Sequence, residues 1–209
     1  MKKKITIVNY GSGNLLSAKQ SFVKALNSTN IKADIQISEN PKDLLDSTHV
    51  VLPGQGAFKT CMEGIKKISG MQDSLNEFVK VKRRPFFGIC VGMQLFADTS
   101  EENGNHPGLG WVKGTIKKLP NTNIKMPHMG WNQVNVVNQN SIIKPEENDY
   151  YFVHSYYFDC FNKQDIVAET KYGINFASII NKENVYGCQF HPEKSSAQGL
   201  KIIKDFLSL

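Results

Sequence analysis

A cysteine at position 90 stands between two glycines, Gly88 and Gly92, at the end of a short apolar run. A strand that enters a helix through so tight a turn leaves no space for Cβ atoms beside the central residue, so this pattern is typical of a nucleophile elbow. Cys90 would project at the N-terminus of a helix beginning near Val91, where the helix dipole and free N–H groups favour a thiolate and an oxyanion. A buried structural cysteine between two loop glycines explains the stretch equally well, so a partner base has to decide.

A candidate base lies near the C-terminus, where the apolar run 185–190 ends in His191, Pro192 and Glu193. We expect this run to be a strand that ends as the strand before Cys90 does. A histidine there can take the thiol proton, and a carboxylate two residues later can fix its tautomer and stabilise the imidazolium. Pro192 restricts the backbone between base and carboxylate. Together these residues favour a Cys-His-Glu triad for acyl transfer.

Residues 88–94 (Gly-Ile-Cys-Val-Gly-Met-Gln) together with residues 191–193 (His-Pro-Glu) resemble the class I glutamine amidotransferases, and the resemblance covers essentially the whole chain. Residues 53–58, 127–132 and 152–156 are similar to one branch of that family, the glutaminase subunits of imidazole glycerol phosphate synthases of histidine biosynthesis.

This resemblance implies a glutaminase that uses no metal and no cofactor. Cys90 would attack the side-chain amide of glutamine, His191 would protonate the leaving ammonia, and water would resolve the glutamyl thioester, with Glu193 orienting His191. Ammonia would pass through a channel to a separate barrel-fold cyclase subunit in a heterodimer.

The resemblance also assigns roles around the triad. The oxyanion hole would consist of backbone groups at Gly54, Gln55 and Val91. The glutamine would be held by Gly56, Gln94, Glu102, Ser155 and Tyr156. The cyclase would contact Asn14, Trp131, Tyr151 and Lys194.

Read without the resemblance, some of these positions have simpler explanations. Residues 53–56 would be a sharp turn, residues 100–104 a solvated loop, and Trp131 and Lys194 ordinary surface positions. Gln55 departs from the small apolar residue of the family. We expect its side-chain amide to hold the loop in a resting conformation.

Apolar runs alternate with helical segments in the first half of the chain, which predicts an α/β fold with a doubly wound, mainly parallel sheet. The predicted strands are residues 4–10, 31–37, 49–52, the run before Cys90 and 185–190. Helices are predicted from Leu15, at 41–45 and over 57–81 with a break at Ser69 and Gly70. The resemblance implies the flavodoxin-like form.

The second half of the chain carries closely spaced strand candidates, which predict antiparallel strands appended to the parallel sheet. These are residues 114–119, 133–137, 151–158, 166–170 and 176–180. A final helix over residues 197–207 would be capped by Ser195 or Ser196. With 209 residues and 40% apolar composition, the chain suits one domain, 1–209.

Two further sequence features are weaker evidence of function. Gly11, Ser12 and Gly13 suggest a dinucleotide-binding loop, but Leu16 stands where the third glycine belongs, so we reject that interpretation. A tight turn or, by resemblance, a partner-facing loop remains. We interpret His128 as a structural histidine.

The net charge of +6 (25 minus 19) is spread without a long basic tract, which disfavours nucleic-acid binding. The four cysteines show no metal-type or disulfide-type spacing and read as reduced thiols of a cytoplasmic protein. The apolar runs are too short for a signal sequence or a membrane span, so we expect no membrane association.

Three other functions remain open. A related glutaminase could feed another acceptor, such as an amidating paralogue in surface-sugar synthesis. A free-standing cysteine hydrolase would act without a partner. A catalytically silent binding module is disfavoured, because all three triad positions are filled.

Overall fold

Two β-sheets form the framework of the described residues, and the larger has nine strands in the order β2-β1-β3-β4-β13-β12-β11-β8-β9. The computed structural model describes residues 2–120, 124–139, 141 and 143–209. The first five of these strands are parallel to one another, in the flavodoxin-like order. They are β1 (Lys3–Val8), β2 (Ala33–Ser38), β3 (His49–Gly54), β4 (Phe86–Cys90) and β13 (Val185–Cys188). The predicted α/β class is confirmed.

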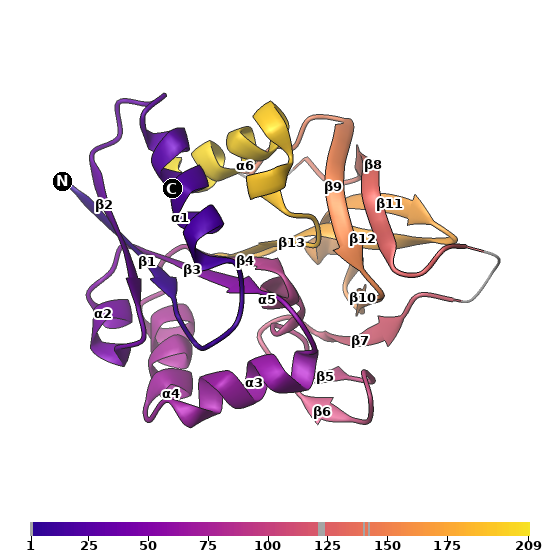
Figure 1. Ribbon diagram of the computed structural model, residues 1–209, viewed down its shortest axis with the longest axis horizontal. Helices are drawn as coiled ribbons and strands as arrows, with labels where there is room; N and C mark the ends of the chain where they lie inside the picture. Colours follow the sequence, from indigo (N-terminus) through magenta and orange to yellow (C-terminus); the bar gives the residue numbers. More distant parts are fainter. Residues whose placement is uncertain (1, 121–123, 140, 142) are drawn as a thin grey trace.

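Helices cover both faces of this parallel half (Figure 1). They are α1 (Leu15–Leu26), α2 (Pro41–Leu45), α3 (Phe58–Lys67), α4 (Met71–Asn76), α5 (Val91–Gln94) and α6 (Ser196–Ser208). The α1 and α6 helices pack together on one face, and α3 and α4 lie on the other. Phe206 of α6 stacks on Phe87 of β4 at 5.1 Å between ring centroids, and full burial of such a side chain stabilises the fold by roughly 1.5–3 kcal/mol.

Local signals explain where several helices begin and end. The Asn14 side chain accepts a hydrogen bond from the Ser17 N–H (3.2 Å) and so caps α1. The predicted break after α3 is confirmed, because Gly70 takes the left-handed conformation (φ 78°) before α4. The chain then leaves α4 through a π-helical turn, Glu77–Val81. Short 3₁₀ turns occupy Lys163–Asp165 and Pro192–Lys194.

The remaining four strands of the large sheet are antiparallel, as the appended strands were predicted to be, and they are as extensive as the parallel half. They are β12 (Ile174–Lys182), β11 (Ile166–Tyr172), β8 (His128–Val136) and β9 (Asn148–His154). The β8 strand begins at His128, earlier than the predicted residue 133, because His128 pairs with His154 at the far end of β9.

The prediction of one strand over residues 151–158 is wrong. The chain breaks at Ser155, where it leaves β9 and enters β10 (Tyr156–Cys160) of the second sheet. That sheet has the order β10-β7-β5-β6, with β7 (Gly114–Lys118), β5 (Thr99–Ser100) and β6 (His106–Pro107). The break places Ser155 at the junction of the two sheets, next to the carboxyl ends of the parallel strands, where ligands bind in folds of this type.

Candidate active site

Cys90 ends β4 and directly precedes α5, in a backbone conformation (φ 54°, ψ −114°) that a non-glycine residue rarely adopts. Both flanking glycines are required by space. A Cβ on Gly92 would lie 1.8 Å from the Leu52 carbonyl oxygen, and one on Gly88 would lie 2.4 Å from the Phe96 ring. The expected elbow is therefore present, with the backbone strain at Cys90 itself.

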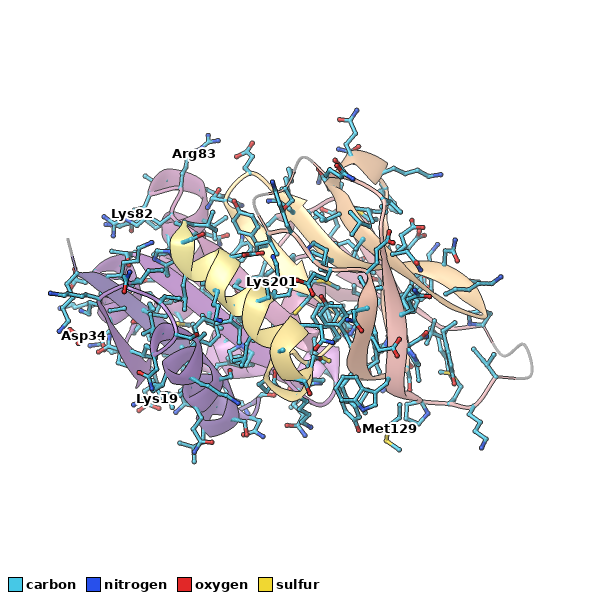
Figure 2. The ribbon with its side chains drawn as sticks, turned by 90° about the horizontal axis from the view of Figure 1, so that it is seen from above. Lys19, Asp34, Lys82, Arg83, Met129 and Lys201 are labelled. Carbon is cyan, nitrogen blue, oxygen red and sulfur yellow. The ribbon has the colours of Figure 1, made fainter. Side chains whose placement is uncertain are left out.

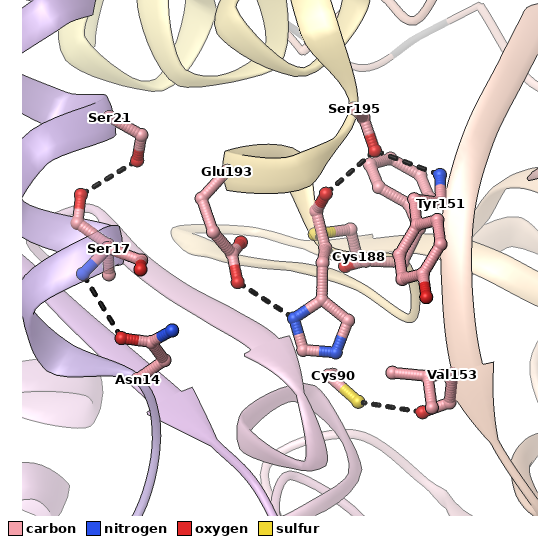
Figure 3. Close-up of polar contacts among 12 residues, drawn as sticks. Asn14, Ser17, Ser21, Cys90, Tyr151, Val153, Cys188, Glu193 and Ser195 are labelled. Atoms are coloured by element: carbon pink, nitrogen blue, oxygen red, sulfur yellow. Dashed lines mark hydrogen bonds and ion pairs between the residues drawn. The ribbon is translucent and has the colours of Figure 1, made fainter. Parts of the chain in front are cut away.

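His191 follows β13, the strand beside β4, so the sheet brings it next to Cys90. Its Nδ1 lies 2.8 Å from Glu193 Oε1, and both side chains are almost fully buried (Figure 3). Burial alone would lower the pKa of His191, but the interactions with Cys90 and Glu193 outweigh it and raise the pKa to about 10. The imidazole therefore holds a proton at neutral pH, as an acid for a leaving group requires.

Ser195 fixes the backbone of the base. Its hydroxyl donates to the His191 carbonyl oxygen (2.7 Å) and accepts from the Tyr151 N–H (3.0 Å). The His191 N–H donates in turn to the Tyr151 carbonyl oxygen (2.9 Å). Ser195, one of the two predicted capping positions, is the N-cap residue of α6, but its side chain makes no capping hydrogen bond and instead ties His191 to β9.

A cavity of about 300 Å³ opens in front of Cys90, within the range of small-molecule sites. The predicted site residues that line it are Asn14, Gly54, Gln55, Gly56, Cys90, Val91, Gln94, Glu102, Ser155, Tyr156, His191, Glu193 and Lys194. Trp131 and Tyr151 are not part of its lining. Pro127, Val153 and His154 also line it, although no site role was predicted for them.

In the loop after β3, the Gln55 N–H, a candidate donor to the oxyanion, is hydrogen-bonded to Ser12 instead. The Gln55 N–H donates to the Ser12 hydroxyl (3.3 Å), and that hydroxyl donates to the Gln55 carbonyl oxygen. The Gln55 side chain is exposed and makes no hydrogen bond among the described residues. The expectation that the Gln55 amide holds this loop is wrong, because Ser12 does so.

Two predicted substrate residues are already engaged by the protein. Glu102 Oε2 accepts from the Phe58 N–H (2.8 Å) at the start of α3, which leaves its other oxygen for a ligand. Gln94 Nε2 donates both to the Tyr156 carbonyl oxygen and to Gln189 Oε1, each at 2.9 Å. Gln94 therefore offers a ligand its carbonyl oxygen alone.

Sequence reasoning missed Ser12, Gln189 and the contact of Cys90 with Val153. Gln189 is fully buried and its Nε2 lies 3.6 Å from Cys90 Sγ. The Cys90 thiol also lies 3.9 Å from the Val153 carbonyl oxygen (Figure 3). A polar residue in the apolar run before His191 was the one available signal for Gln189.

Three of the four predicted partner contacts, Trp131, Tyr151 and Lys194, lie next to one another. Asn14 and Lys194 line the cavity, and the Lys194 ammonium stands over the Tyr151 ring at 5.7 Å. Tyr151 contacts Trp131 edge to face at 6.1 Å. Trp131 and its neighbour Met129 are exposed, and Figure 2 shows the Met129 side chain projecting outward at the lower edge of the view.

The other cysteines have different surroundings. All four thiols are free, and burial raises the pKa of Cys160 to about 11 and holds the pKa of Cys188 well above its usual range. In the described parts of the chain, no group of three or more histidine, cysteine or acidic residues could hold a metal ion. No helix among the described residues is long and apolar enough to cross a membrane.

Comparison with known proteins places this geometry in context. Residues 7–209 match the model of the family described as glutamine amidotransferase class-I. The chain is 43% identical to the imidazole glycerol phosphate synthase subunit HisH of Pelagibacter ubique, over 98% of this chain and 99% of that protein. It is 41% identical to the subunit of the same name from Rhodospirillum rubrum, over 98% of each.

Solved structures agree at the level of the fold. A glutamine amidotransferase superposes with a TM-score of 0.71 at 17% identity, covering 98% of this chain and 99% of that one. Another, from Thermotoga maritima, gives a TM-score of 0.67 at 18% identity over 97% of this chain and 80% of that one.

Proposed function

The chain belongs to the class I glutamine amidotransferase family, and we propose that within it the protein is the glutaminase subunit of an imidazole glycerol phosphate synthase. One observation carries the proposal. His191, whose Nδ1 lies 2.8 Å from Glu193, stands beside Cys90 at the ends of neighbouring strands. The chain that carries this triad is 43% identical to an imidazole glycerol phosphate synthase subunit.

The reaction begins when the Cys90 sulfur attacks the side-chain carbonyl carbon of glutamine. The oxyanion that forms faces the Val91 N–H at the start of α5, and it needs a second donor from the Gly54-Gln55 loop. The protonated His191 gives its proton to the leaving nitrogen, ammonia departs, and a thioester remains. His191 then takes a proton from water, the resulting hydroxide attacks the thioester, and glutamate leaves with the thiol restored.

Glutamine is held by the remaining lining residues. The free oxygen of Glu102 suits the α-ammonium group, and the Gln94 carbonyl oxygen suits a donor of the substrate. Gly56, Ser155 and Tyr156 complete the cavity wall. These contacts orient the substrate without touching the reacting carbon.

The ammonia is passed to a separate cyclase subunit, a barrel-fold protein that forms a heterodimer with this chain. That subunit supplies the ribosyl phosphate site that the cavity described here does not provide. Its docking surface on this chain is the rim of the cavity, which we define as Asn14 and Lys194 of the cavity wall together with Tyr151 and Trp131 next to Lys194. Four free thiols support a cytoplasmic location for the pair.

The test is a glutaminase assay of the purified chain alone, with the cyclase, and with the cyclase plus its phosphoribosyl nucleotide. We expect a stable one-to-one complex and the highest rate when all three are present. A high rate without partner would identify a free-standing hydrolase. Failure to bind the histidine-pathway cyclase, with activation by another acceptor subunit, would identify an amidating paralogue.

A further inference from the structure

Gln189 is buried beside the nucleophile and has no role in the reaction as derived above. Its relative exposure is 0%, and it lies between the end of β13 and His191. A glutamine side chain without hydrogen bonds is costly to bury, so its two polar atoms need partners. One is Gln94, whose Nε2 donates to Gln189 Oε1, and the other is Cys90 Sγ, 3.6 Å from Gln189 Nε2.

The orientation of the Gln189 amide follows from the hydrogen bond between Gln94 and the Tyr156 carbonyl oxygen. A backbone carbonyl can only accept, so the atom of Gln94 that lies 2.9 Å from the Tyr156 carbonyl oxygen is its nitrogen. The same nitrogen contacts Gln189, which must therefore present its oxygen to Gln94. The amide nitrogen of Gln189 is left to face Cys90.

The Tyr156 carbonyl is itself held from the other side. His154 Nδ1 lies 2.9 Å from it and must donate, which makes His154 Nε2 an acceptor for His128 Nδ1–H, also at 2.9 Å. Asn132 then donates to His128 Nε2 (3.1 Å). The donor and acceptor roles in this hydrogen-bond network all follow from one group, the Tyr156 carbonyl, which can only accept. The network runs from β8 to the residue after β13, and it holds the Gln189 amide with its N–H toward Cys90.

We propose that Gln189 is a positioning residue for Cys90, which donates its amide N–H to the sulfur and so favours the thiolate over the thiol. The opposite contact of Cys90, with the Val153 carbonyl oxygen at 3.9 Å, suits the thiol because a carbonyl oxygen accepts the S–H proton and repels a thiolate.

Four other titratable side chains act on Cys90. The protonated His191 favours the thiolate. Tyr10, Cys61 and Cys188 are uncharged at neutral pH because burial raises the pKa of each. None of them is replaced in a Gln189 variant, so removal of the Gln189 donor shifts Cys90 toward the unreactive thiol.

The experiment measures the rate at which iodoacetamide alkylates Cys90 as a function of pH, with the Cys90 peptide quantified by mass spectrometry. Gln189→Glu keeps the acceptor for Gln94 and loses the donor to Cys90 when ionised. Gln189→Leu loses both. We expect the pH midpoint of alkylation to rise in both variants by about one to two units, because a hydrogen bond to a charged group stabilises it roughly ten- to hundredfold.

The matched control is Gln36→Leu, which removes a partly buried glutamine that donates to Thr6 at the other edge of the sheet. It should leave the midpoint unchanged. A rise in Gln189→Leu alone would mean that Gln189 acts through Gln94 or packing and would overturn the proposal, as would an unchanged midpoint in both variants.

If Gln189→Leu fails to fold, the natural protein still decides, because the carboxylate of Gln189→Glu also repels the thiolate and raises the midpoint by itself. In the natural protein the Gln189 side-chain amide protons should shift in NMR spectra as Cys90 titrates, and they should not shift in Cys90→Ser. The role of Gln189 in catalysis rests on the proposed function, but the alkylation of Cys90 can be measured without glutamine. A protein that proved not to hydrolyse glutamine could still show the shift, and a confirmed glutaminase could lack it.

Discussion

Ser12 holds both backbone polar groups of Gln55, since its hydroxyl accepts from the Gln55 N–H at 3.3 Å and donates to the Gln55 backbone carbonyl oxygen. The two residues belong to different loops, one after β1 and one after β3. If the Gln55 N–H is an oxyanion donor, the hole is incomplete while this contact lasts. The peptide has to turn before catalysis is fast, and Gly56, with φ of 93° and open space around it, permits the turn.

The first prediction is that Ser12→Ala raises the glutaminase rate of the chain without its partner. The variant loses two hydrogen bonds of about 0.5–1.5 kcal/mol each, which makes the turn easier, so the rate should rise roughly five- to hundredfold. Glutamate release is measured alone and with the cyclase plus nucleotide, where no gain is expected. Ser28→Ala, which removes a hydroxyl at the end of α1, is the control. An unchanged or lower partner-free rate would place the resting state elsewhere.

Gly54→Ala is expected to behave differently. A Cβ on Gly54 would lie 2.2 Å from the Gly92 N atom, inside the elbow. The variant should lose activity in every condition, because it distorts the support of Cys90 together with the loop.

The second prediction concerns the nucleophile. Cys90→Ser should abolish glutamine hydrolysis, whereas Cys160→Ser should keep most of it, because Cys160 lies at the end of β10 and does not line the cavity. Added ammonium should still support the cyclase reaction of the Cys90→Ser complex, since the thiol makes ammonia and does not consume it. Full glutaminase activity in Cys90→Ser would refute the thioester route.

The third prediction ranks the other two triad members. His191→Asn should lower kcat by several orders of magnitude, and Glu193→Gln by less, because the imidazole remains. Glu193 helps to raise the pKa of His191 to about 10, so Glu193→Gln should also move the alkaline limb of the pH–rate profile to lower pH. Equal losses in both variants with an unmoved alkaline limb would contradict the assignment.

The fourth prediction is a loss of stability in acid. Burial lowers the pKa of His49 and His128 to about 4, and burial with the nearby His128 lowers that of His154 to about 3. In the unfolded chain these groups titrate near 6.5, so the unfolded state binds more protons below that pH. The free energy of unfolding is therefore at its full value above pH 6.5. As the pH drops toward 4, each of these histidines lowers it by about 1.4 kcal/mol per pH unit.

Urea unfolding at several pH values between 7 and 4.5 measures this slope. His128→Gln removes one of the three groups, so the slope should fall by about one third. A slope as steep as that of the natural protein would show that His128 is not buried in its neutral form.

The sequence predicted what depends on local spacing. The elbow at Cys90, the paired strand ends and the alternation of strands and helices all follow from residues close together in the chain. The break at Ser155 could not be predicted, because residues 151–158 form one apolar-rich run and what divides it is the pairing of β10 with β7. Ser12 and Gln189 escaped for the same reason, since their partners, Gln55 and Cys90, lie 43 and 99 residues away.

The neighbouring positions of β4 and β13 have a consequence for how such a protein diverges. Ile89 and Cys188 pair across these strands, and Cys90 and His191 follow at the ends. Their separation is set by backbone hydrogen bonding at the roughly 4.8 Å spacing of any sheet, so it is inherited whatever side chains the core contains. The rim is built from loops and strand edges that carry no such constraint. Related proteins that pass ammonia to different acceptors can therefore differ in the residues of the rim, while the nucleophile and its base stay at one fixed distance.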